Sequence, residues 1–395
     1  MPEDPRAVRL DALIVGGGIA GLWLANLLTR RGYAIALFEA EALGCAQTLG
    51  SQGMIHGGLK YALGGRLTTA SEAISGMPAR WRTCLAGHGD VDLSGLEPLS
   101  PRYYLFAQAG SLGRLTTFFA SRALRGRITR LPATRFPEGL ERLDGTVYEL
   151  DDFVIDTPAL LSALLAPVAD RVFRHRLTAD QLTATESGWR CRLTGCDKEL
   201  HANRLVLCAG AGNGALVSGL GLEGPAMQLR PLTQVVARHP DLEPLYAHCL
   251  TGISRPEPRL TITSHRDPLQ ADRWLWYLGG QLASDGANRS DDEQIAHARQ
   301  ELKRCVPWVD WTRADLSCLR WDRAEPAQTD GHRPDEAFVG EARGVLVCWP
   351  TKLTLAPDLG DRVLEHLDPP RFDPAEVPVI DLPRAMLAPL PWVPA

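Results

Sequence analysis

The first forty residues contain two apolar patterns of different period. Residues 10–15 are apolar almost throughout, which is typical of a parallel strand buried on both faces. Apolar residues at helical spacing follow over residues 22–28, and two arginines followed by Gly32 indicate where that helix ends. A second strand is predicted over residues 33–38. The pattern therefore predicts a strand, a helix and a second parallel strand, which is the opening unit of an α/β fold.

The turn between the first strand and the helix is rich in glycine and fits the pattern G-x-G-x-x-G. Gly16 would permit a tight turn, Gly18 would let a pyrophosphate approach the backbone, and Gly21 would let helix and strand pack closely. Glu39 lies 23 residues after Gly16 and can accept hydrogen bonds from an adenosine ribose, which disfavours NADP. We therefore expect a dinucleotide to be bound by Gly16, Gly18, Ile19, Ala20, Gly21, Glu39 and Ala40.

The later part of the chain is less regular. Residues 228–237, 259–263 and 274–278 have the composition of strands in a mixed sheet. Residues 291–305 form a polar-faced helix that ends before a proline, and the proline-rich tail after residue 367 is expected to be irregular and to pack on the body of the protein.

Composition excludes several classes of protein. The chain has 395 residues, of which 45% are hydrophobic and 23% charged, as in an ordinary globular protein with a sizeable core. A formal net charge of −5 gives no overall attraction for nucleic acid. The nine cysteines form no C-x-x-C pair, which indicates reduced thiols, a cytoplasmic location and no structural zinc site. We expect no metal centre and find no G-x-S-x-G motif of a hydrolase.

Residues 55–61 read I-H-G-G-L-K-Y, and at this point the sequence resembles the D-amino-acid oxidase superfamily of FAD-dependent enzymes. The nearest resemblance is to the FAD-dependent glycerol-3-phosphate dehydrogenases, whose segment reads I-H-G-G-L-R-Y. Residues 154–160 and 205–213 resemble further superfamily segments, and residues 345–354 resemble the G-G-K-L-T-T segment of the glycerol-3-phosphate enzymes. Pro350 and Thr351 replace the two glycines of that segment, and the C-terminal helical domain of those enzymes is not expected here.

The resemblance implies FAD, bound without a covalent link, and a fold in two interleaved parts. A Rossmann-like α/β domain with a parallel sheet would bind FAD, and a substrate domain built on a mixed β-sheet would be inserted into it. We expect the FAD domain to comprise residues 1–80, 150–221 and 331–370, the substrate domain residues 81–149 and 222–330, and the tail residues 371–395.

The resemblance also implies the remaining site residues. Further contacts to FAD would come from Gln47, Thr48, Ser51, Gln52, Gly53, Ala209, Gly210, Thr351, Lys352, Leu353 and Thr354. Residues expected near the reacting part of FAD and the substrate are His56, Lys60, Tyr61, Arg323 and Lys352, with Arg333 as an alternative to Arg323. Only four of the 42 basic residues are lysines, and two of them fall in the flavin motifs. Lysines and an arginine around one flavin face would suit an anionic substrate.

Other candidate residues have plainer interpretations. His265 could act as a base, but a position at the surface end of a strand is the stronger expectation. Five tryptophans are expected in the core or in the wall of the pocket rather than in the chemistry, namely Trp274, Trp276, Trp308, Trp311 and Trp321.

The leading hypothesis is an oxidoreductase that transfers a hydride from a CH–OH carbon of a small anionic substrate, such as a 2-hydroxy acid or a polyol phosphate, to flavin N5. The alternative is an amino-acid or amine oxidase of the same superfamily that acts on a CH–NH bond. A third hypothesis is a flavoprotein partner that relays electrons. The electron acceptor (O₂, a quinone or a carrier protein) and the oligomeric state stay open.

One local charge pattern bears on location. Seven arginines and no acidic residue lie between Glu97 and Glu138, with apolar residues among them. Residues 112–131 could therefore lie on the inner face of a membrane as a basic amphipathic segment, although a solvated part of the substrate domain is the simpler interpretation.

Overall fold

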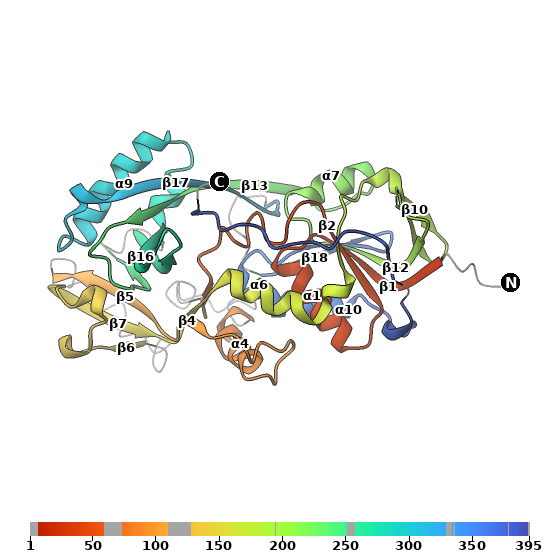
Figure 1. Ribbon diagram of the computed structural model, residues 1–395, viewed down its shortest axis with the longest axis horizontal. Coiled ribbons are helices and arrows are strands. Elements are labelled where there is room, and N and C mark those ends of the chain that lie inside the picture. The colour runs from red at the N-terminus through yellow and green to blue at the C-terminus, as the bar shows by residue number, and fades with distance from the viewer. Residues whose placement is uncertain are drawn as a thin grey trace.

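A computed structural model describes residues 7–58, 73–109, 128–193, 195–250, 257–328, 334, 336–377 and 379–393. The chain forms two bodies along one long axis, each built on its own sheet (Figure 1). A small three-stranded sheet lies between them, made of β3 (Met54–Ile55), β8 (Phe153–Ile155) and β4 (Pro98–Ser100).

The first body contains the predicted parallel sheet, whose strands β9, β2, β1, β12 and β19 all run in the same direction. The antiparallel strands β10 and β11 extend one side of β12, and β18 pairs with β19. The strand bounds are β1 (Ala7–Val15), β2 (Ile35–Glu39), β9 (Val172–Arg174), β10 (Leu182–Thr185), β11 (Gly188–Arg192), β12 (Glu199–Leu207), β18 (Phe338–Ala342) and β19 (Val345–Trp349).

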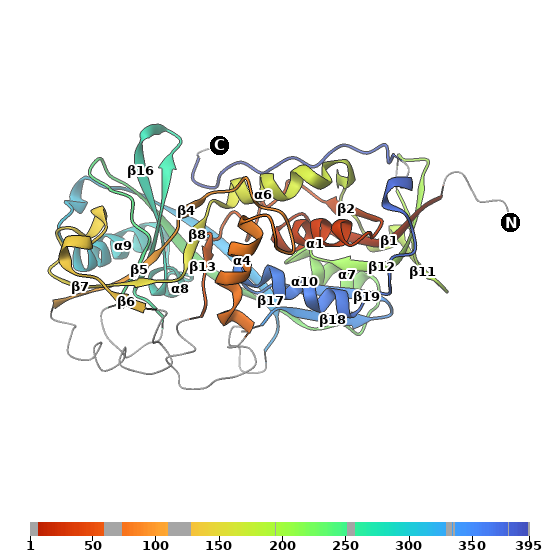
Figure 2. The same cartoon turned by 90° about the horizontal axis from the view of Figure 1, so that it is seen from below.

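Helices cover both faces of this sheet. α1 (Ile19–Arg30) packs between α6 (Thr157–Leu165) and α10 (Ala356–Glu365) on one face, as Figure 2 shows, and α4 (Met77–Leu85) lies beside them. α7 (Gly212–Gly219) packs on the other face through Leu216. Ten of the twelve residues of α1 are buried, which explains why its sequence is apolar on every side.

The second body is an eight-stranded mixed sheet with the order β17-β13-β16-β15-β14-β5-β7-β6. Its pairs are antiparallel except β14 with β5. α8 (Gln281–Asp285) and α9 (Asp291–Cys305) pack against it, and α9 has the predicted bounds. The strands are β5 (Tyr103–Gln108), β6 (Ile128–Arg130), β7 (Gly145–Leu150), β13 (Met227–Arg238), β14 (Ala247–Cys249), β15 (Leu260–Asp267), β16 (Gln270–Gly279) and β17 (Asp315–Pro326).

Two long strands connect the bodies. β13 and β17 pair along their whole length, from Met227 opposite Pro326 to Arg238 opposite Asp315, and Figure 1 shows both running from one body toward the other. Trp81 and Leu93 pack in the core of the first body, although they follow residue 80, where the expected division falls. The expected domain division itself stays a prediction.

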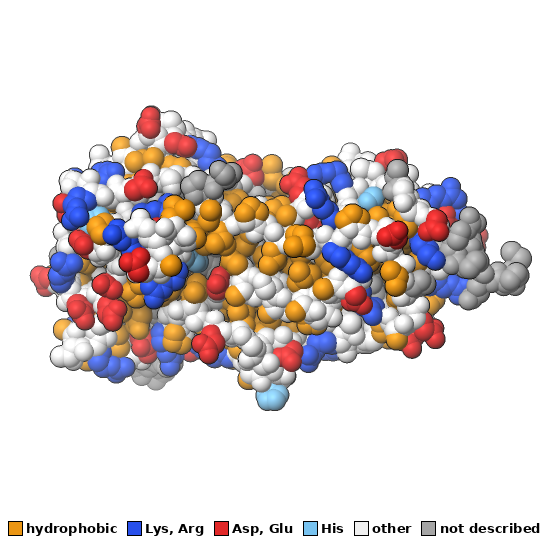
Figure 3. All heavy atoms as spheres, in the orientation of Figure 1, with side chains coloured by type: hydrophobic (Ala, Val, Ile, Leu, Met, Phe, Trp, Pro, Cys, Tyr) orange, Lys and Arg blue, Asp and Glu red, His pale blue; other side chains and the backbone are white. Residues whose placement is uncertain are grey.

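The tail crosses the molecule as an extended segment, as expected, and packs on both bodies. Leu43 donates its amide to the Met386 carbonyl at 2.8 Å in the first body. At the other end Arg238 donates to the Trp392 carbonyl at 2.6 Å, and the Trp392 ring is buried against Val236 and Tyr277 of the second sheet. Figure 3 shows apolar side chains gathered along the path that the tail follows in Figure 1.

None of the helices in the described residues is long and apolar enough to cross a membrane. Residues 10–28, which are apolar almost throughout, form β1 and α1 as predicted. Most of the arginine-rich segment falls within residues 110–127, outside the described residues, so its predicted membrane contact stays a prediction.

Candidate active site

A cleft of about 1430 Å³ extends from the carboxyl ends of β1 and β2 to the second sheet. At one end it is lined by the glycine turn and by Glu39, and further along by residues 44–54. The segments after β12 and β19 line the middle, and strands β13, β14 and β17 of the second sheet close the other end. The carboxyl ends of parallel strands are where open α/β sheets bind ligands.

The glycine turn is crowded by backbone. Gly16 has a φ of +109°, and a Cβ there would lie 2.5 Å from the Cys208 carbonyl oxygen. A Cβ on Gly21 would lie 1.9 Å from the Gly16 carbonyl oxygen, so only glycine allows α1 to start this close to β1. Gly18 is the N-cap of α1, and the first turn of that helix carries no acidic residue. This helix N-terminus can therefore receive the negative charge of a pyrophosphate, because its amides and its dipole favour an anion.

Glu39 lies at the end of β2 and lines the cleft. Its carboxylate accepts the Gly17 amide at 2.6 Å and the Glu41 amide at 2.9 Å. Two backbone donors fix the carboxylate beside the glycine turn, and its remaining lone pairs can accept hydroxyl groups of a ribose. The spacing of Glu39 from the glycine motif therefore has the structural context that the sequence predicts.

Residues 47–53 connect the two bodies. The Thr48 hydroxyl accepts the Ile19 amide at 3.0 Å, so it fixes the first turn of α1. The Gln52 amide group donates to the carbonyls of Thr261 at 3.1 Å and Tyr277 at 2.8 Å, and Gln47 accepts the Ala324 amide at 3.1 Å. Both glutamines line the cleft, but these bonds hold the second sheet against the first body. Ser51 and Gly53 also line the cleft.

The segment after β12 returns to the glycine turn, as the sequence predicts. Ala209 and Gly210 line the cleft, and Gly210 has a φ of +57°. Asn213 is fully buried, accepts the Ala209 amide at 2.8 Å and donates to the Cys348 carbonyl at 3.2 Å. This asparagine joins the ends of β12 and β19, a role for which the sequence pattern gives no signal.

The segment after β19 carries the only lysine among the described residues that line the cleft. Lys352 is 5% exposed, and its Nζ donates to the Pro334 carbonyl at 3.1 Å. It is the N-cap of a short 3₁₀ helix, η8 (Leu353–Leu355), that leads into α10. Thr351 has a φ of +58°, a left-handed conformation that the glycine of the resembling motif would adopt without strain. Thr351 and Leu353 line the cleft, and Thr354 is buried beside it.

The two predicted flavin motifs meet at Thr354. Its hydroxyl accepts the His56 amide at 3.3 Å and donates to the His56 carbonyl at 3.3 Å. The Gly58 amide donates to Nδ1 of His56 at 3.3 Å, and the Gly57 amide donates to Asp152 at 2.9 Å. Because Nδ1 accepts a hydrogen bond from the Gly58 amide, a neutral His56 ring carries its proton on Nε2. Lys60 and Tyr61 lie outside the described residues.

Arginines from neighbouring strands line the other end of the cleft. Arg323 on β17 lies directly opposite Arg230 on β13, and its Nε donates to the Arg230 carbonyl at 3.4 Å. Arg230 also pairs with the buried Glu325 at 3.3 Å. Arg323 is thus at the cleft, as the resemblance implies, and Arg333 lies outside the described residues.

Aromatic residues form part of the wall. A Cβ on Gly50 would lie 2.6 Å from the Trp321 ring, so that ring rests on the backbone of the first body. The Trp321 indole donates to the Tyr277 hydroxyl at 2.8 Å, and Tyr277 donates to Gln234 at 2.6 Å. Trp276 and Trp311 are buried in the second core, as expected. Trp349 is buried against Phe338 and donates to the Gly210 carbonyl at 3.1 Å.

The expectation for His265 is wrong. It is buried in the middle of the second sheet, and its ring lies 4.4 Å from the Trp392 ring. Burial lowers the pKa of His265 to about 4, and the residue does not line the cleft. The short S-H-R motif reads as a strand end, but the strand continues through Asp267 and the tail covers the histidine.

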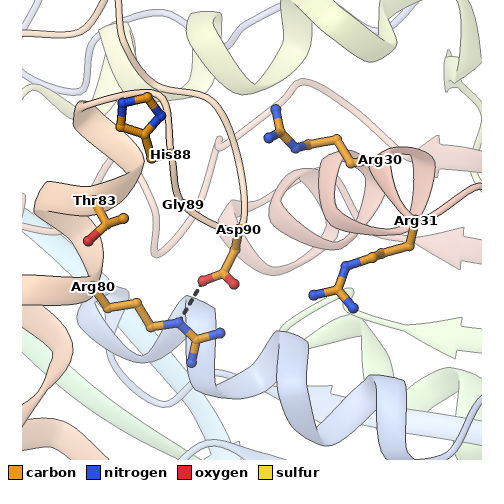
Figure 4. A pocket seen from close by; sticks show the side chains of 7 residues that line it. All are labelled: Arg30, Arg31, Arg80, Thr83, His88, Gly89 and Asp90. Atoms are coloured by element: carbon orange, nitrogen blue, oxygen red, sulfur yellow. Dashed lines mark hydrogen bonds and ion pairs between the residues drawn. The ribbon is translucent and has the colours of Figure 1, made fainter.

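A second hollow, of about 480 Å³, lies between the end of α1 and α4 (Figure 4). Arg30 and Arg31 line it together with Arg80 and Asp90. Arg80 pairs with Asp90 at 2.6 Å and with Asp361 at 2.6 Å, so its charge is already neutralised. Across the described ranges, no group of His, Cys, Asp and Glu side chains could hold a metal ion.

The model of the DAO family, described as FAD dependent oxidoreductase, matches residues 11–357. The chain is 46% identical to the probable FAD-dependent oxidoreductase PA4991 of Pseudomonas aeruginosa over 98% of both chains. The crystal structure of PA4991 superposes with a TM-score of 0.81 at 40% identity, covering 98% of this chain and 99% of that one.

More distant structures share the fold. Glycine oxidase from Geobacillus kaustophilus has a TM-score of 0.61 at 20% identity, covering 92% of this chain and 96% of its own. L-α-glycerophosphate oxidase from Mycoplasma pneumoniae, solved with FAD bound, has a TM-score of 0.64 at 13% identity, covering 91% of this chain and 94% of its own.

Proposed function

Because the chain belongs to the DAO family of FAD-dependent oxidoreductases, we propose that it oxidises a CH–OH carbon of a small anionic substrate, a 2-hydroxy acid or a polyol phosphate. The observation that carries the proposal is the junction of the two motifs at the cleft. His56 and Thr354 are joined by two hydrogen bonds, and the buried Lys352 lies two residues before Thr354. Both segments resemble those of enzymes that act on a hydroxyl-bearing phosphate.

FAD fits the cleft. Bound FAD supplies an acceptor for a hydride. The crowded glycine turn, the α1 N-terminus and Glu39 would hold its dinucleotide end, as argued above. The rest of the cleft, between residues 47–53 and the segment after β19, would hold the ring system. These roles for single residues belong to the proposal.

The charges around the cleft support an anionic substrate. Lys352 carries a buried positive charge, and Arg323 and Arg230 bring two guanidinium groups to the same cleft. A carboxylate or phosphate could accept charge-assisted hydrogen bonds from these side chains in addition to the contacts that they already make. Neutral His56 would add a donor through Nε2–H, which can hold the substrate oxygen.

A substrate screen tests the proposal. The purified protein is mixed with 2-hydroxy acids, polyol phosphates and amino acids, and the reduction of a dye acceptor is followed. We expect reduction with a hydroxy acid or polyol phosphate and none with the corresponding uncharged alcohol. Release of ammonia from an amino acid, with no reduction by any hydroxy compound, would assign the protein to CH–NH oxidation instead.

A further inference from the structure

His248 is a titratable residue of the cleft that sequence analysis did not single out. It is the middle residue of β14, whose other two side chains, Ala247 and Cys249, are buried. Strand alternation turns His248 to the opposite side, where it lines the cleft together with Leu250.

The imidazole ring is held on two sides. Its Nδ1 is 3.0 Å from the Thr261 hydroxyl on β15, and its ring centroid lies 4.7 Å from that of Tyr103 on β5. Both supports are themselves fixed, because Tyr103 donates to the Ile262 carbonyl at 3.0 Å and Gln52 donates to the Thr261 carbonyl. With Nδ1 and one ring face occupied, the Nε2 edge and the opposite ring face remain to face the cleft.

The cleft needs a proton acceptor, and several of its other polar groups suit other tasks. His175 lies at the Glu39 end, where its amide donates to the Glu39 carbonyl at 2.8 Å. His56 accepts a hydrogen bond from the Gly58 amide at Nδ1, so its neutral ring carries a donor at Nε2. Asp152 holds the Gly57 amide at 2.9 Å, and Glu257 accepts the Ser284 hydroxyl at 3.0 Å at an exposed position. Lys352 and Arg323 are cations. His248 is the described histidine of the cleft whose Nδ1 can donate to a side-chain hydroxyl, which leaves a lone pair on Nε2.

We propose that Nε2 of His248 is the general base that takes the proton from the substrate hydroxyl, an assignment that rests on the proposed function. Oxidation of CH–OH to C=O removes two electrons and two hydrogens from the substrate. One hydrogen leaves carbon as a hydride with both electrons of the C–H bond, which the cofactor accepts. The other leaves oxygen as a proton, and Nε2 binds it to form an imidazolium ion. That proton passes to water when the product leaves and the cleft opens to solvent.

The surroundings of His248 determine its protonation state. Burial lowers the pKa of His248 to about 3, and no charged side chain contributes to the shift. The ring is therefore neutral at ordinary pH and has a lone pair, but the same low pKa makes it a weak base in the empty cleft, so proton transfer requires a bound anion that raises the pKa. A bound anionic substrate would place negative charge in the same cleft, and negative charge stabilises the imidazolium once the proton has moved.

The proton position can be measured without any substrate. The chain has ten histidines, and two-bond ¹H–¹⁵N spectra of histidine-labelled holoprotein distinguish the two neutral tautomers of each ring. The ring signals lost in His248→Asn identify residue 248. We expect His248 to be neutral with its proton on Nδ1 at neutral pH, and a proton on Nε2 or a charged ring would overturn the proposal.

The kinetic test uses His248→Asn, whose amide can still reach Thr261 but has no group at the Nε2 position. The matched control is His265→Asn, which changes a buried histidine of the neighbouring strand outside the cleft. With a substrate that reduces the wild-type protein, we expect the rate of flavin reduction to fall about 10²–10⁴-fold in His248→Asn. FAD content and substrate Kd should be nearly unchanged, and His265→Asn should reduce at close to the wild-type rate.

The outcomes separate the two proposals. If the wild-type protein is reduced and His248→Asn is reduced equally fast, the base assignment is wrong while the proposed function stands. Rescue of the His248→Ala rate by added imidazole would support the assignment directly, because free base would replace the missing one. If no hydroxy compound reduces the wild-type protein, the proposed function fails, and the base assignment fails with it.

Discussion

Several side chains at the cleft form hydrogen bonds with main-chain groups rather than with one another. The side chains of Glu39, Thr48, His56 and Asn213 each accept a hydrogen bond from a main-chain amide of the site. A substitution at such a position therefore moves backbone as well as removing a side chain. Lys352 is 5% exposed at the cleft wall, and its Nζ donates to the Pro334 carbonyl. A neutral side chain of similar length at this position therefore tests what the amino group contributes.

Lys352→Met keeps most of the side-chain length and removes the charge. We expect FAD to remain bound, because the glycine turn and Glu39 hold the other end of the cofactor. Flavin reduction by substrate should slow by about 10²–10³-fold, the usual effect of losing one electrostatic donor at a reacting centre. Stopped-flow absorbance at the flavin band measures the rate. Lys303→Met, at an exposed position of α9, is the control, and equal rates in both variants would remove Lys352 from the catalytic site.

The sequence predicts local features of the site well and long-range ones poorly. The glycine turn and Glu39 follow from spacing within one strand–helix–strand unit. His248 gives no comparable signal, because its place at the cleft depends on how β14 pairs with β15 and β5 in the second sheet. His265 was misplaced for the same reason, since the residue that covers it, Trp392, is far away in the sequence.

Among the elements, the tail has the clearest structural task. It is bonded to the first body at Leu43 and to the second through Trp392, and Trp392 contacts Tyr277, which holds the Trp321 wall of the cleft. The tail thus packs across the junction of the two bodies. Proline content predicts its irregular course, but composition alone does not predict where an extended segment docks.

Trp392→Ala should release the end of the tail. Removing a buried tryptophan ring costs about 3 kcal/mol or more of stability. Because the tail can detach locally, the free energy of unfolding of the whole protein should fall by less than this. We expect faster proteolysis within the tail and a lower thermal midpoint. Met386→Ala, at a position of the same tail that is 72% exposed, should change neither, within about 0.5 kcal/mol. Equal proteolysis of the two variants would contradict the docking of Trp392.

For the whole molecule, the lowered pKa values of His265 and His248 predict loss of stability in acid. Burial lowers the pKa of His265 to about 4 and that of His248 to about 3, whereas histidine in the unfolded chain has a pKa of about 6.5. Below about pH 6.5 the unfolded chain binds protons that the folded protein does not. Each histidine therefore stabilises the fold fully above about pH 6.5, and its contribution falls by about 1.4 kcal/mol per pH unit down to its folded pKa.

Urea unfolding at about pH 7.5 and about pH 5 measures this effect. His265→Gln has no imidazole to bind the proton. Its free energy of unfolding should therefore fall less between the two pH values than that of the wild-type protein, and this comparison does not depend on how stable the variant is at the higher pH. His88→Gln is the control, because His88 lies at the exposed hollow beside α4. An unchanged pH response in His265→Gln would contradict the neutral state of that buried ring.

The cofactor should be held without a covalent bond. Burial raises the pKa of the Cys45 thiol at the cleft, and Glu39 adds to the rise, so this thiol is protonated and a poor nucleophile. Acid precipitation should therefore release yellow flavin into the supernatant. A yellow pellet would show a covalent link, and His56 would then be the residue to examine by peptide mapping.

The fold of the whole molecule was predicted more completely than its substrate. The order of motifs along the chain predicts the parallel sheet and the mixed sheet, and the family match from residue 11 to residue 357 confirms the superfamily. The substrate depends on which side chains from β13, β14, β17 and the segment after β19 meet at one end of the cleft. Tertiary structure, not local sequence, brings these side chains together. The same fold occurs in both a glycine oxidase and a glycerophosphate oxidase.

The most direct test of the account is anaerobic stopped-flow reduction of the bound flavin with matched pairs of compounds. Each pair has the same carbon skeleton and differs only in a hydroxyl or an amino group on the carbon to be oxidised, or in the presence of the anionic group. The account predicts that the hydroxy member reduces the flavin, that its amino partner does not, and that removing the carboxylate or phosphate abolishes the reaction. Reduction by the amino members alone, or equally by the uncharged alcohols, would contradict it.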